Sequence, residues 1–148
     1  MKTVLVSGAN GYIASRLIEE LIGKYTVFAI VRDLDSSLPQ AVSRVYADLS
    51  QRGCTKFLPT DVDYLFHFAH SNEYRNFPVG AEDMFDVNVG ATFELLEWGR
   101  KTGLEKFIYA STGTIYGSGG APFREDSTPT IRSLYSATKY LSEVLLSQ

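Results

Sequence analysis

The sequence predicts an α/β fold with a doubly wound parallel sheet. Short apolar runs rich in β-branched residues alternate with longer segments of helical periodicity, which is typical of βαβ units. A length of 148 residues suits one domain, and contents of 45% hydrophobic and 21% charged residues are ordinary for a protein with a buried core. We therefore expect residues 1–148 to form one domain, with helices on both faces of the sheet.

The first half of the chain supplies four expected strands. Residues 4–6 form a strand buried on both faces, and a helix over residues 12–23 follows it directly, with Ile13, Leu17 and Leu21 at helical spacing. Further strands are expected at residues 27–31, 44–46 and 64–68. A loop or short helix over residues 34–41 and one or two helical turns over residues 51–58 connect them.

The second half adds the longest helix, a fifth strand and a last helix. The long helix covers residues 81–101 and has two apolar faces, one with Phe85, Val89, Phe93 and Leu96 and the other with Met84, Ala91, Leu95 and Trp98. A strand over 106–110, a Gly/Pro/Ser-rich loop over 117–129 and a helix from Ser133 onward follow, the helix turning Tyr140, Leu141, Val144 and Leu145 inward. Doubly wound dinucleotide-binding sheets ordinarily have six strands, and this sequence stops inside a helix. We therefore expect a C-terminally truncated chain without its substrate-binding C-terminal region.

Charge and composition argue against several classes of function. The net charge is −3 and Lys and Arg do not cluster, whereas nucleic acids and anionic membranes attract a positive face. The apolar runs are strand-sized, well short of the ~20 residues of a membrane span. Cys54 is the only cysteine, so no disulfide framework exists. These features predict a cytoplasmic protein with a small-molecule substrate.

The most specific motif is the glycine-rich turn between the first strand and the first helix. Gly8 permits a tight turn, Gly11 lets a diphosphate approach the backbone, and Ala14 is small enough for close helix–strand packing. Unpaired amides and the dipole at a helix start bind anions. The motif predicts a Rossmann fold that binds NAD or NADP, with cofactor contacts at Gly8, Asn10, Gly11, Tyr12 and Ile13.

The end of the second strand bears on which of the two cofactors binds. An acidic side chain there would hold the ribose 2′-hydroxyl of NAD, whereas Arg suits the 2′-phosphate of NADP. The chain offers Arg32 followed by Asp33, and Arg32 occupies the position where the acid is expected. The guanidinium matches phosphate geometry. Arg32 and Asp33 are therefore cofactor-binding candidates, and Arg32 favours NADP over NAD.

A second group of residues indicates proton transfer. Tyr135 and Lys139 are one helical turn apart, and an ammonium beside a phenol lowers its pKa. Thr112 follows the fifth strand at its carboxyl end, where ligands bind in open α/β sheets. Thr112, Tyr135 and Lys139 are therefore the predicted catalytic residues, which move a proton while hydride is exchanged with the nicotinamide.

Taken together, these motifs resemble the extended short-chain dehydrogenase/reductase family, the group of UDP-glucose 4-epimerase and related nucleotide-sugar enzymes. The matching stretches, in family order, are residues 8–14, 47–49, 66–69, 88–92, 107–117 and 135–139. The resemblance implies that Asp48, with Leu49 beside it, contacts the adenine and that Phe68 and Ala69 line the pyrophosphate and ribose. It also implies that Asn88 supports the helix near the site, that Ser111 lies beside the nicotinamide, and that Tyr135 and Lys139 contact the cofactor as well as acting in catalysis.

Two departures from the family pattern are informative. Ala14 replaces the usual third glycine, a mild change. The 4,6-dehydratases of this family carry Asp-Glu directly after the catalytic Thr, whereas Gly113 and Thr114 stand here, which disfavours water elimination.

Other residues have plainer interpretations. His67 and His70 have no metal-ligand partners nearby in the sequence, so we expect them to anchor the backbone or face solvent, and no zinc site is expected. Helix 81–101 has two apolar faces, whereas packing on a sheet buries only one. By resemblance, this helix forms a four-helix bundle in family homodimers, which predicts a homodimer through residues 81–101.

The sequence thus favours an NAD(P)-dependent nucleotide-sugar epimerase resembling UDP-glucose 4-epimerase. An NADPH-dependent carbonyl reductase of the same family is the alternative enzyme, and a non-catalytic cofactor-binding module is the alternative without chemistry. The presence of Thr112, Tyr135 and Lys139 together weighs against the last.

Overall fold

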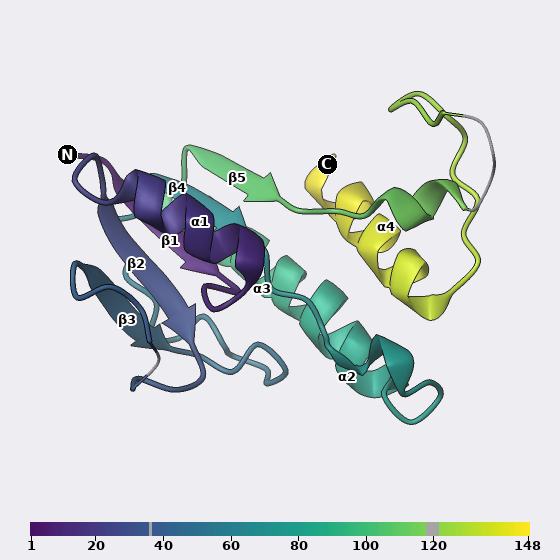
Figure 1. Cartoon of the computed structure of the whole chain (residues 1–148), viewed down its shortest axis with the longest axis horizontal. Coiled ribbons are helices and arrows are strands. Elements are labelled where there is room, and N and C mark those ends of the chain that lie inside the picture. Colours follow the sequence, from purple (N-terminus) through teal and green to yellow (C-terminus); the bar gives the residue numbers. More distant parts are fainter. Residues whose placement is uncertain (36, 118–121) are drawn as a thin grey trace.

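The computed structural model describes residues 1–35, 37–117 and 122–148, and it contains one five-stranded sheet (Figure 1). The strands are β1 (Thr3–Ser7), β2 (Thr26–Val31), β3 (Val42–Tyr46), β4 (Tyr64–His67) and β5 (Lys106–Tyr109). All neighbouring strands are parallel, in the order β3-β2-β1-β4-β5. The predicted strands and the predicted fold class are confirmed.

The described helices connect the strands and extend beyond the sheet. They are α1 (Tyr12–Leu21), the 3₁₀ turn η1 (Glu73–Arg75), α2 (Ala81–Phe85), the π turn η2 (Asp86–Gly90), α3 (Ala91–Thr102), the 3₁₀ turn η3 (Gly113–Tyr116) and α4 (Leu134–Leu146). None of these helices is long and apolar enough to cross a lipid bilayer.

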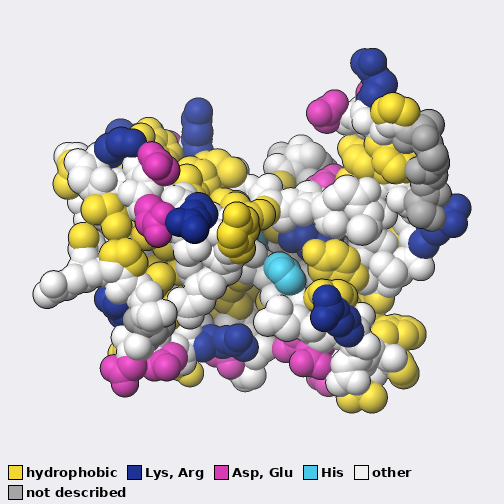
Figure 2. All heavy atoms as spheres, in the orientation of Figure 1, with side chains coloured by type: hydrophobic (Ala, Val, Ile, Leu, Met, Phe, Trp, Pro, Cys, Tyr) yellow, Lys and Arg dark blue, Asp and Glu magenta, His cyan; other side chains and the backbone are white. Residues whose placement is uncertain are grey.

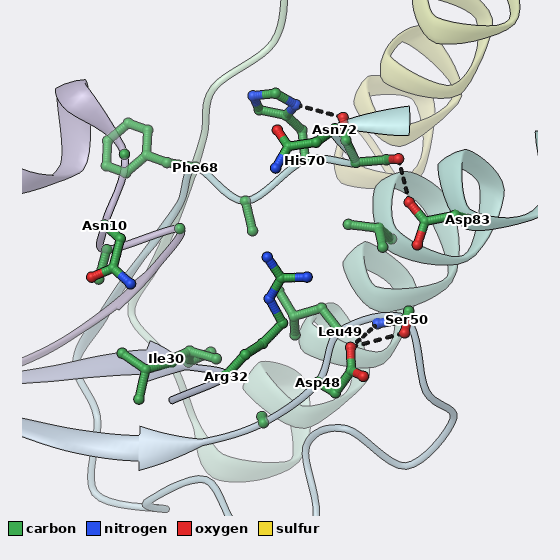
Figure 3. Close-up of a pocket in the computed structure, with 18 of the residues that line it drawn as sticks. Asn10, Ile30, Arg32, Asp48, Leu49, Ser50, Phe68, His70, Asn72 and Asp83 are labelled. Atoms are coloured by element: carbon green, nitrogen blue, oxygen red, sulfur yellow. Dashed lines mark hydrogen bonds between the residues drawn. The ribbon is translucent and has the colours of Figure 1, made fainter. Parts of the chain in front are cut away.

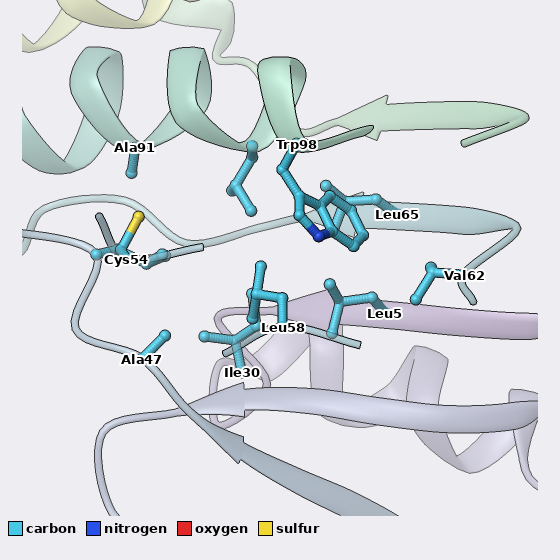
Figure 4. Packing of buried hydrophobic residues seen from close by; sticks show 11 residues of the cluster. Leu5, Ile30, Ala47, Cys54, Leu58, Val62, Leu65, Ala91 and Trp98 are labelled. Atoms are coloured by element: carbon cyan, nitrogen blue, oxygen red, sulfur yellow. The ribbon is translucent and has the colours of Figure 1, made fainter. Parts of the chain in front are cut away.

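The core consists of two apolar layers, one on each face of the sheet. Alternate side chains of β1 enter different layers, because successive residues of a strand point to opposite faces. Val4 and Val6 pack with Ile18 of α1, whereas Leu5 packs with Leu95 and Trp98 of α3 (Figure 4). Helices therefore cover both faces, which makes the sheet doubly wound.

Two expected helices differ from the structure. Residues 51–58 form turns without a helix, and Cys54 and Leu58 pack these turns under the α3 face of the sheet. The long helix expected over residues 81–101 is interrupted by η2, whose wider turn separates α2 from α3. Part of the expected loop over residues 117–129, namely 118–121, lies outside the described residues.

The predicted inward face of the last helix is wrong for two of its four residues, since Tyr140 and Leu145 are half-buried but the other two are not. Leu141 and Val144 of α4 are exposed, and the buried residues of this helix are Ser136, Thr138, Lys139 and Ser142. The reason is that α4 packs beyond the end of the sheet against α2 and η2 (Figure 1). There its Thr138 and Ser142 form hydrogen bonds with Asn88 of η2. The site described next depends on this polar face.

Candidate active site

A cavity of about 540 Å³ opens at the carboxyl ends of β1, β2 and β4 (Figure 3). Its size lies within the range of roughly 300–1,000 Å³ that is usual for small-ligand sites. In the sheet order β3-β2-β1-β4-β5, β2 and β3 lie on one side of β1, and β4 and β5 lie on its other side. Ligands of open α/β sheets bind at the point where the strand order reverses in this way. The glycine-rich turn lines the cavity with Gly8, Ala9, Asn10 and Gly11.

Gly8 is required at this turn for two separate reasons. Its φ is +69°, a conformation that residues with a Cβ rarely adopt. A Cβ at this position would also lie 2.7 Å from the backbone nitrogen of Ala69, so the turn touches the end of β4 directly. The following helix begins at Gly11 without a side-chain cap, which leaves its first amides for a ligand. These features fit a dinucleotide diphosphate.

Three charged residues are predicted to contact the adenosine part of the cofactor, and the structure does not place all of them at the cavity. Arg32 points into the cavity, whereas Asp33 is not among the described residues that line it. The Asp33 carboxylate instead accepts a hydrogen bond from the Asp35 backbone amide at 2.9 Å. Asp48 lines the cavity, and one of its oxygens accepts hydrogen bonds from the amide (3.0 Å) and hydroxyl (2.8 Å) of Ser50.

Thr112 and Tyr135 come together at the end of β5. Thr112 precedes η3 and caps it by accepting a hydrogen bond from the Thr114 amide. Tyr135 lies in the first turn of α4, which starts at a capping box between Ser133 and Ser136. Burial raises the pKa of Tyr135, and the nearby Tyr74 acts in the same direction, while a hydrogen bond with the Thr112 side chain lowers it. The Thr112 side chain and the burial of the phenol therefore act on the pKa of Tyr135 in opposite directions.

Lys139 occupies a different position from the one expected. Its side chain is 2% exposed, and its ammonium donates to the Ala110 carbonyl oxygen at 2.7 Å and lies 4.1 Å from the centre of the Tyr109 ring. Burial lowers the pKa of Lys139 to about 8. Lys139 is not among the groups that act on the pKa of Tyr135, and its ammonium binds the Ala110 carbonyl.

Asn88 links the loop after β4 to the catalytic helix. Its Oδ1 accepts from the Ser71 amide at 2.9 Å, and its Nδ2 donates to the Thr138 hydroxyl at 2.9 Å. The Asn88 carbonyl accepts hydroxyl protons from Thr92 and Ser142, both at 2.6 Å. Asn88 thus holds α4 in place, as the resemblance implied.

His67 is buried in the middle of a related hydrogen-bond chain. Because the Thr92 hydroxyl donates to Asn88, it accepts from Nε2 of His67 at 3.0 Å, and Nδ1 accepts from the Ser7 hydroxyl at 2.6 Å. Burial lowers the pKa of His67 to about 3, and the charge of Lys139 acts in the same direction. His67 is therefore a neutral anchor, although it contacts side chains rather than the backbone.

The structure brings half of the predicted site residues to the lining of the cavity. Of the cofactor-binding candidates, the cavity is lined by Gly8, Asn10, Gly11, Arg32, Asp48, Leu49, Phe68 and Ala69. The other candidates do not line it, namely Tyr12, Ile13, Asp33, Asn88, Ser111, Tyr135 and Lys139, and neither does Thr112. Tyr12 and Ile13 are exposed at the start of α1, and Ser111 is exposed just after β5.

Sequence reasoning missed several lining residues. His70, Ser71 and Asn72 line the cavity directly after β4, a position that the rule of ligand binding at carboxyl ends of strands could have identified. Asp83 and Val87 also line it from the long helix, where nothing in the sequence distinguishes them from other helical positions. Among the described residues no group of three or more possible metal ligands occurs.

Comparisons with known proteins agree with this site. The model of a family described as the NAD dependent epimerase/dehydratase family matches residues 4–148. A UDP-glucose 4-epimerase of Azospirillum brasilense is 29% identical over 150 residues, covering 97% of this chain and 43% of the relative. A dTDP-D-glucose 4,6-dehydratase of Mus musculus is 30% identical, covering 96% of this chain and 44% of the relative. The chain thus spans less than half the length of these two relatives.

Solved structures show the same fold. A UDP-galactose 4-epimerase superimposes with a TM-score of 0.84 at 29% identity, over 97% of this chain and 49% of the other. The protein MoeE5, solved with UDP-glucose and NAD, gives a TM-score of 0.80 at 30% identity, over 97% of this chain and 47% of the other. Both similarities cover the glycine-rich turn and the Thr112–Lys139 region, since nearly the whole chain is aligned.

Proposed function

Because the chain belongs to the NAD-dependent epimerase/dehydratase family, we propose that its 148 residues form the cofactor-binding and proton-transfer part of a nucleotide-sugar 4-epimerase. The position of Tyr135 beside the cavity carries this proposal, because the centre of its ring lies 6.1 Å from that of His70, which lines the cavity. The relatives and structural neighbours named above act on or bind UDP- or dTDP-linked sugars according to their names, which supports a substrate of the same class.

Each residue has a definite task in the proposed reaction. The chemistry that bound NAD would supply is hydride transfer from and to the sugar carbon. Tyr135 takes the proton of the substrate hydroxyl at its phenolic oxygen and gives it back, and Thr112 hydrogen-bonds the same substrate oxygen. Gly8 and Gly11 would hold the diphosphate with backbone amides. Lys139 would bind the nicotinamide ribose.

The test is epimerisation by the full-length protein with UDP-galactose and UDP-glucose as probes. We expect interconversion with bound NAD, and Tyr135→Phe and Thr112→Val should each lower kcat by about 100-fold or more. Both variants should bind NAD(H) as the parent does, measured by NADH fluorescence, because neither side chain lines the diphosphate turn. Full turnover by Tyr135→Phe would refute the proposed mechanism.

A 4-epimerase is preferred to a dehydratase because of the residues after Thr112. Gly113 and Thr114 carry no carboxyl group, and the Thr114 hydroxyl lies 3.1 Å from that of Thr112. Elimination of water needs an acid and a base of its own, which Gly113 and Thr114 do not provide. A product analysis that yields a 4-keto-6-deoxy sugar would overturn this preference.

One observation favours a second candidate, a carbonyl reductase that uses NADPH. Arg32 points into the cavity near Asp48, while Asp33 accepts a hydrogen bond from its own loop (Figure 3). A guanidinium there can bind a 2′-phosphate bidentately. Titration with NADH and NADPH distinguishes the cofactors, and Arg32→Ala should weaken NADPH binding alone. Consumption of NADPH with simple ketones, without epimerisation, would support the reductase.

We also propose that the protein is a homodimer through helices α2–α3 and α4. Phe85 and Phe93 are exposed on the long helical segment, and Leu141 and Val144 are exposed on α4. Exposed apolar side chains on two neighbouring helices provide the surface that helix–helix association needs.

A further inference from the structure

Two aromatic rings from the loop after β4 lie against the phenol of Tyr135. The centre of the Tyr74 ring is 5.4 Å from that of Tyr135, at an interplanar angle of 45°. The ring of His70 is 6.1 Å from Tyr135 in an edge-to-face arrangement, and 6.5 Å from Tyr74. Aromatic pairs at such separations attract each other beyond the burial of their surface. Tyr135 therefore contacts aromatic side chains that lie outside its own helix.

The segment that carries these rings is braced at several points. The Ser71 amide is bound by Asn88, and the Ser71 hydroxyl donates to Asp83 and accepts from the Glu73 amide. Farther on, Gly80 packs directly on Glu73, since a Cβ there would lie 2.5 Å from Glu73 Cβ. These contacts fix η1, and with it Tyr74, relative to the helix α2.

The same bracing reaches the catalytic helix. Asn88 binds both the Ser71 amide and the Thr138 hydroxyl, and Thr138 donates to the Tyr135 carbonyl. Asn88 therefore anchors both the loop after β4 and the first turn of α4. Through this shared anchor it holds Tyr74 and Tyr135 at their observed separation.

The individual rings are also oriented. His70 donates from Nδ1 to the Ser71 carbonyl at 2.9 Å, since a carbonyl only accepts (Figure 3). The Arg75 guanidinium lies 5.2 Å from the centre of the Tyr74 ring and steadies it by a cation–π contact. In Figure 2 a histidine (cyan) is visible at the surface, and it is His70, because His67 is fully buried. His70 also lines the cavity, so it stands between the cofactor site and the phenol.

We propose that Tyr74 and His70 are positioning residues for Tyr135: they fix the orientation of its phenol and keep water from one side of it. The inference rests on the proposed role of Tyr135 as the proton-transfer residue. The sequence predicts that residues 74–78 border the site, and the structure adds that the Tyr74 ring lies against Tyr135 of α4.

The first test needs no substrate. Tyrosine isotopically labelled at Cζ gives an NMR signal that follows ionisation of each phenol, and Tyr135→Phe assigns the signal of Tyr135. The groups that contact or act on Tyr135 all come from other segments and are Thr112, His70, Tyr74 and Tyr109. In Tyr74→Leu we expect the Tyr135 pKa to fall, since burial and the second phenol both raise it.

The second test is kinetic and uses the full-length protein with UDP-galactose as the probe. Tyr74→Leu should lower kcat about 10-fold with KM within about twofold, because the substrate-binding contacts remain while the phenol is misaligned. Tyr74→Phe, which keeps the ring, should restore kcat to within about twofold of the parent. His70→Leu should resemble Tyr74→Leu.

Tyr25→Leu is the matched control. Tyr25 and Tyr64 form a comparable ring pair, 6.3 Å apart, at the other end of the sheet. This control should change neither the Tyr135 signal nor kcat. An unchanged Tyr135 signal and kcat in Tyr74→Leu would overturn the inference. A shifted signal in a protein that does not epimerise UDP-galactose would uphold it and refute the proposed function instead.

Discussion

His67 and Lys139 are buried side chains whose ordinary charged forms the fold disfavours. His67 is fully buried between Ser7 and Thr92, and Lys139 has the Ala110 carbonyl and the Tyr109 ring as partners. For both groups burial is the main cause of a lowered pKa, because the charged form loses its hydration. The two side chains link different elements, since His67 joins β4 to β1 and α3, whereas Lys139 joins α4 to the end of β5.

The lowered pKa of His67 predicts acid sensitivity. The unfolded chain binds a proton at His67 near the ordinary pKa of 6.5, whereas the folded chain does so only near about 3. Folding is therefore favoured by neutral His67 above the unfolded value, and this stability is lost as the pH falls through the window between the two. Between about pH 7 and pH 5 the parent should lose about 2 kcal/mol more than His67→Asn.

Urea unfolding at the two pH values measures this difference. The exposed His70 and the carboxylates are common to both proteins and cancel in the comparison. Parallel losses of stability in the parent and in His67→Asn would contradict the buried neutral imidazole.

At the scale of elements, the strand-to-helix turn and the interrupted long helix position the site. The turn after β1 touches the end of β4 at Gly8, which brings the amides of α1 to the cavity. The π turn η2 carries Asn88, whose side chain and carbonyl bind the loop after β4 and α4. Neither connection depends on a single long-range ion pair.

Glycine substitutions separate the two requirements at the turn. Gly8→Ala combines a positive φ with a backbone collision, whereas Gly53→Ala has a similar φ of +76° and nothing within 4 Å. Gly53→Ala should cost about 1 kcal/mol of unfolding free energy and leave NADH binding unchanged. Gly8→Ala should cost about 2–4 kcal/mol and weaken NADH binding more than about tenfold.

Unfolding curves and NADH fluorescence provide both measurements. Equal behaviour of the two variants would mean that the close approach of the turn to β4 has no energetic consequence.

At the scale of the whole molecule, the chain has a sheet half and a helical half (Figure 1). The sheet half is packed on both faces by apolar layers. The helical half buries mainly polar side chains of α4 and leaves apolar ones exposed. This distribution is the reason for the proposed association of two copies through the helices.

A charge on that surface tests the association. Phe93→Glu should convert the dimer to a monomer in light scattering, because a buried unpaired carboxylate is costly at an interface. Phe57→Glu is the control, as Phe57 is 74% exposed in the loop between β3 and β4. A dimer in Phe93→Glu, or a monomer in the parent, would contradict the proposed interface.

The sequence by itself determined the order of strands and helices, the doubly wound sheet, the glycine-rich turn, and Thr112 with Tyr135 as neighbours. These features follow from periodicity and short motifs, which depend on residues close together in the chain. Only the tertiary structure decided that α4 buries its polar face, that Lys139 binds the Ala110 carbonyl, that Asp33 turns away from the cavity, and that His70 and Tyr74 lie on Tyr135. These contacts join residues far apart in the sequence, and their partners are set by how elements pack, which no local pattern of residues encodes.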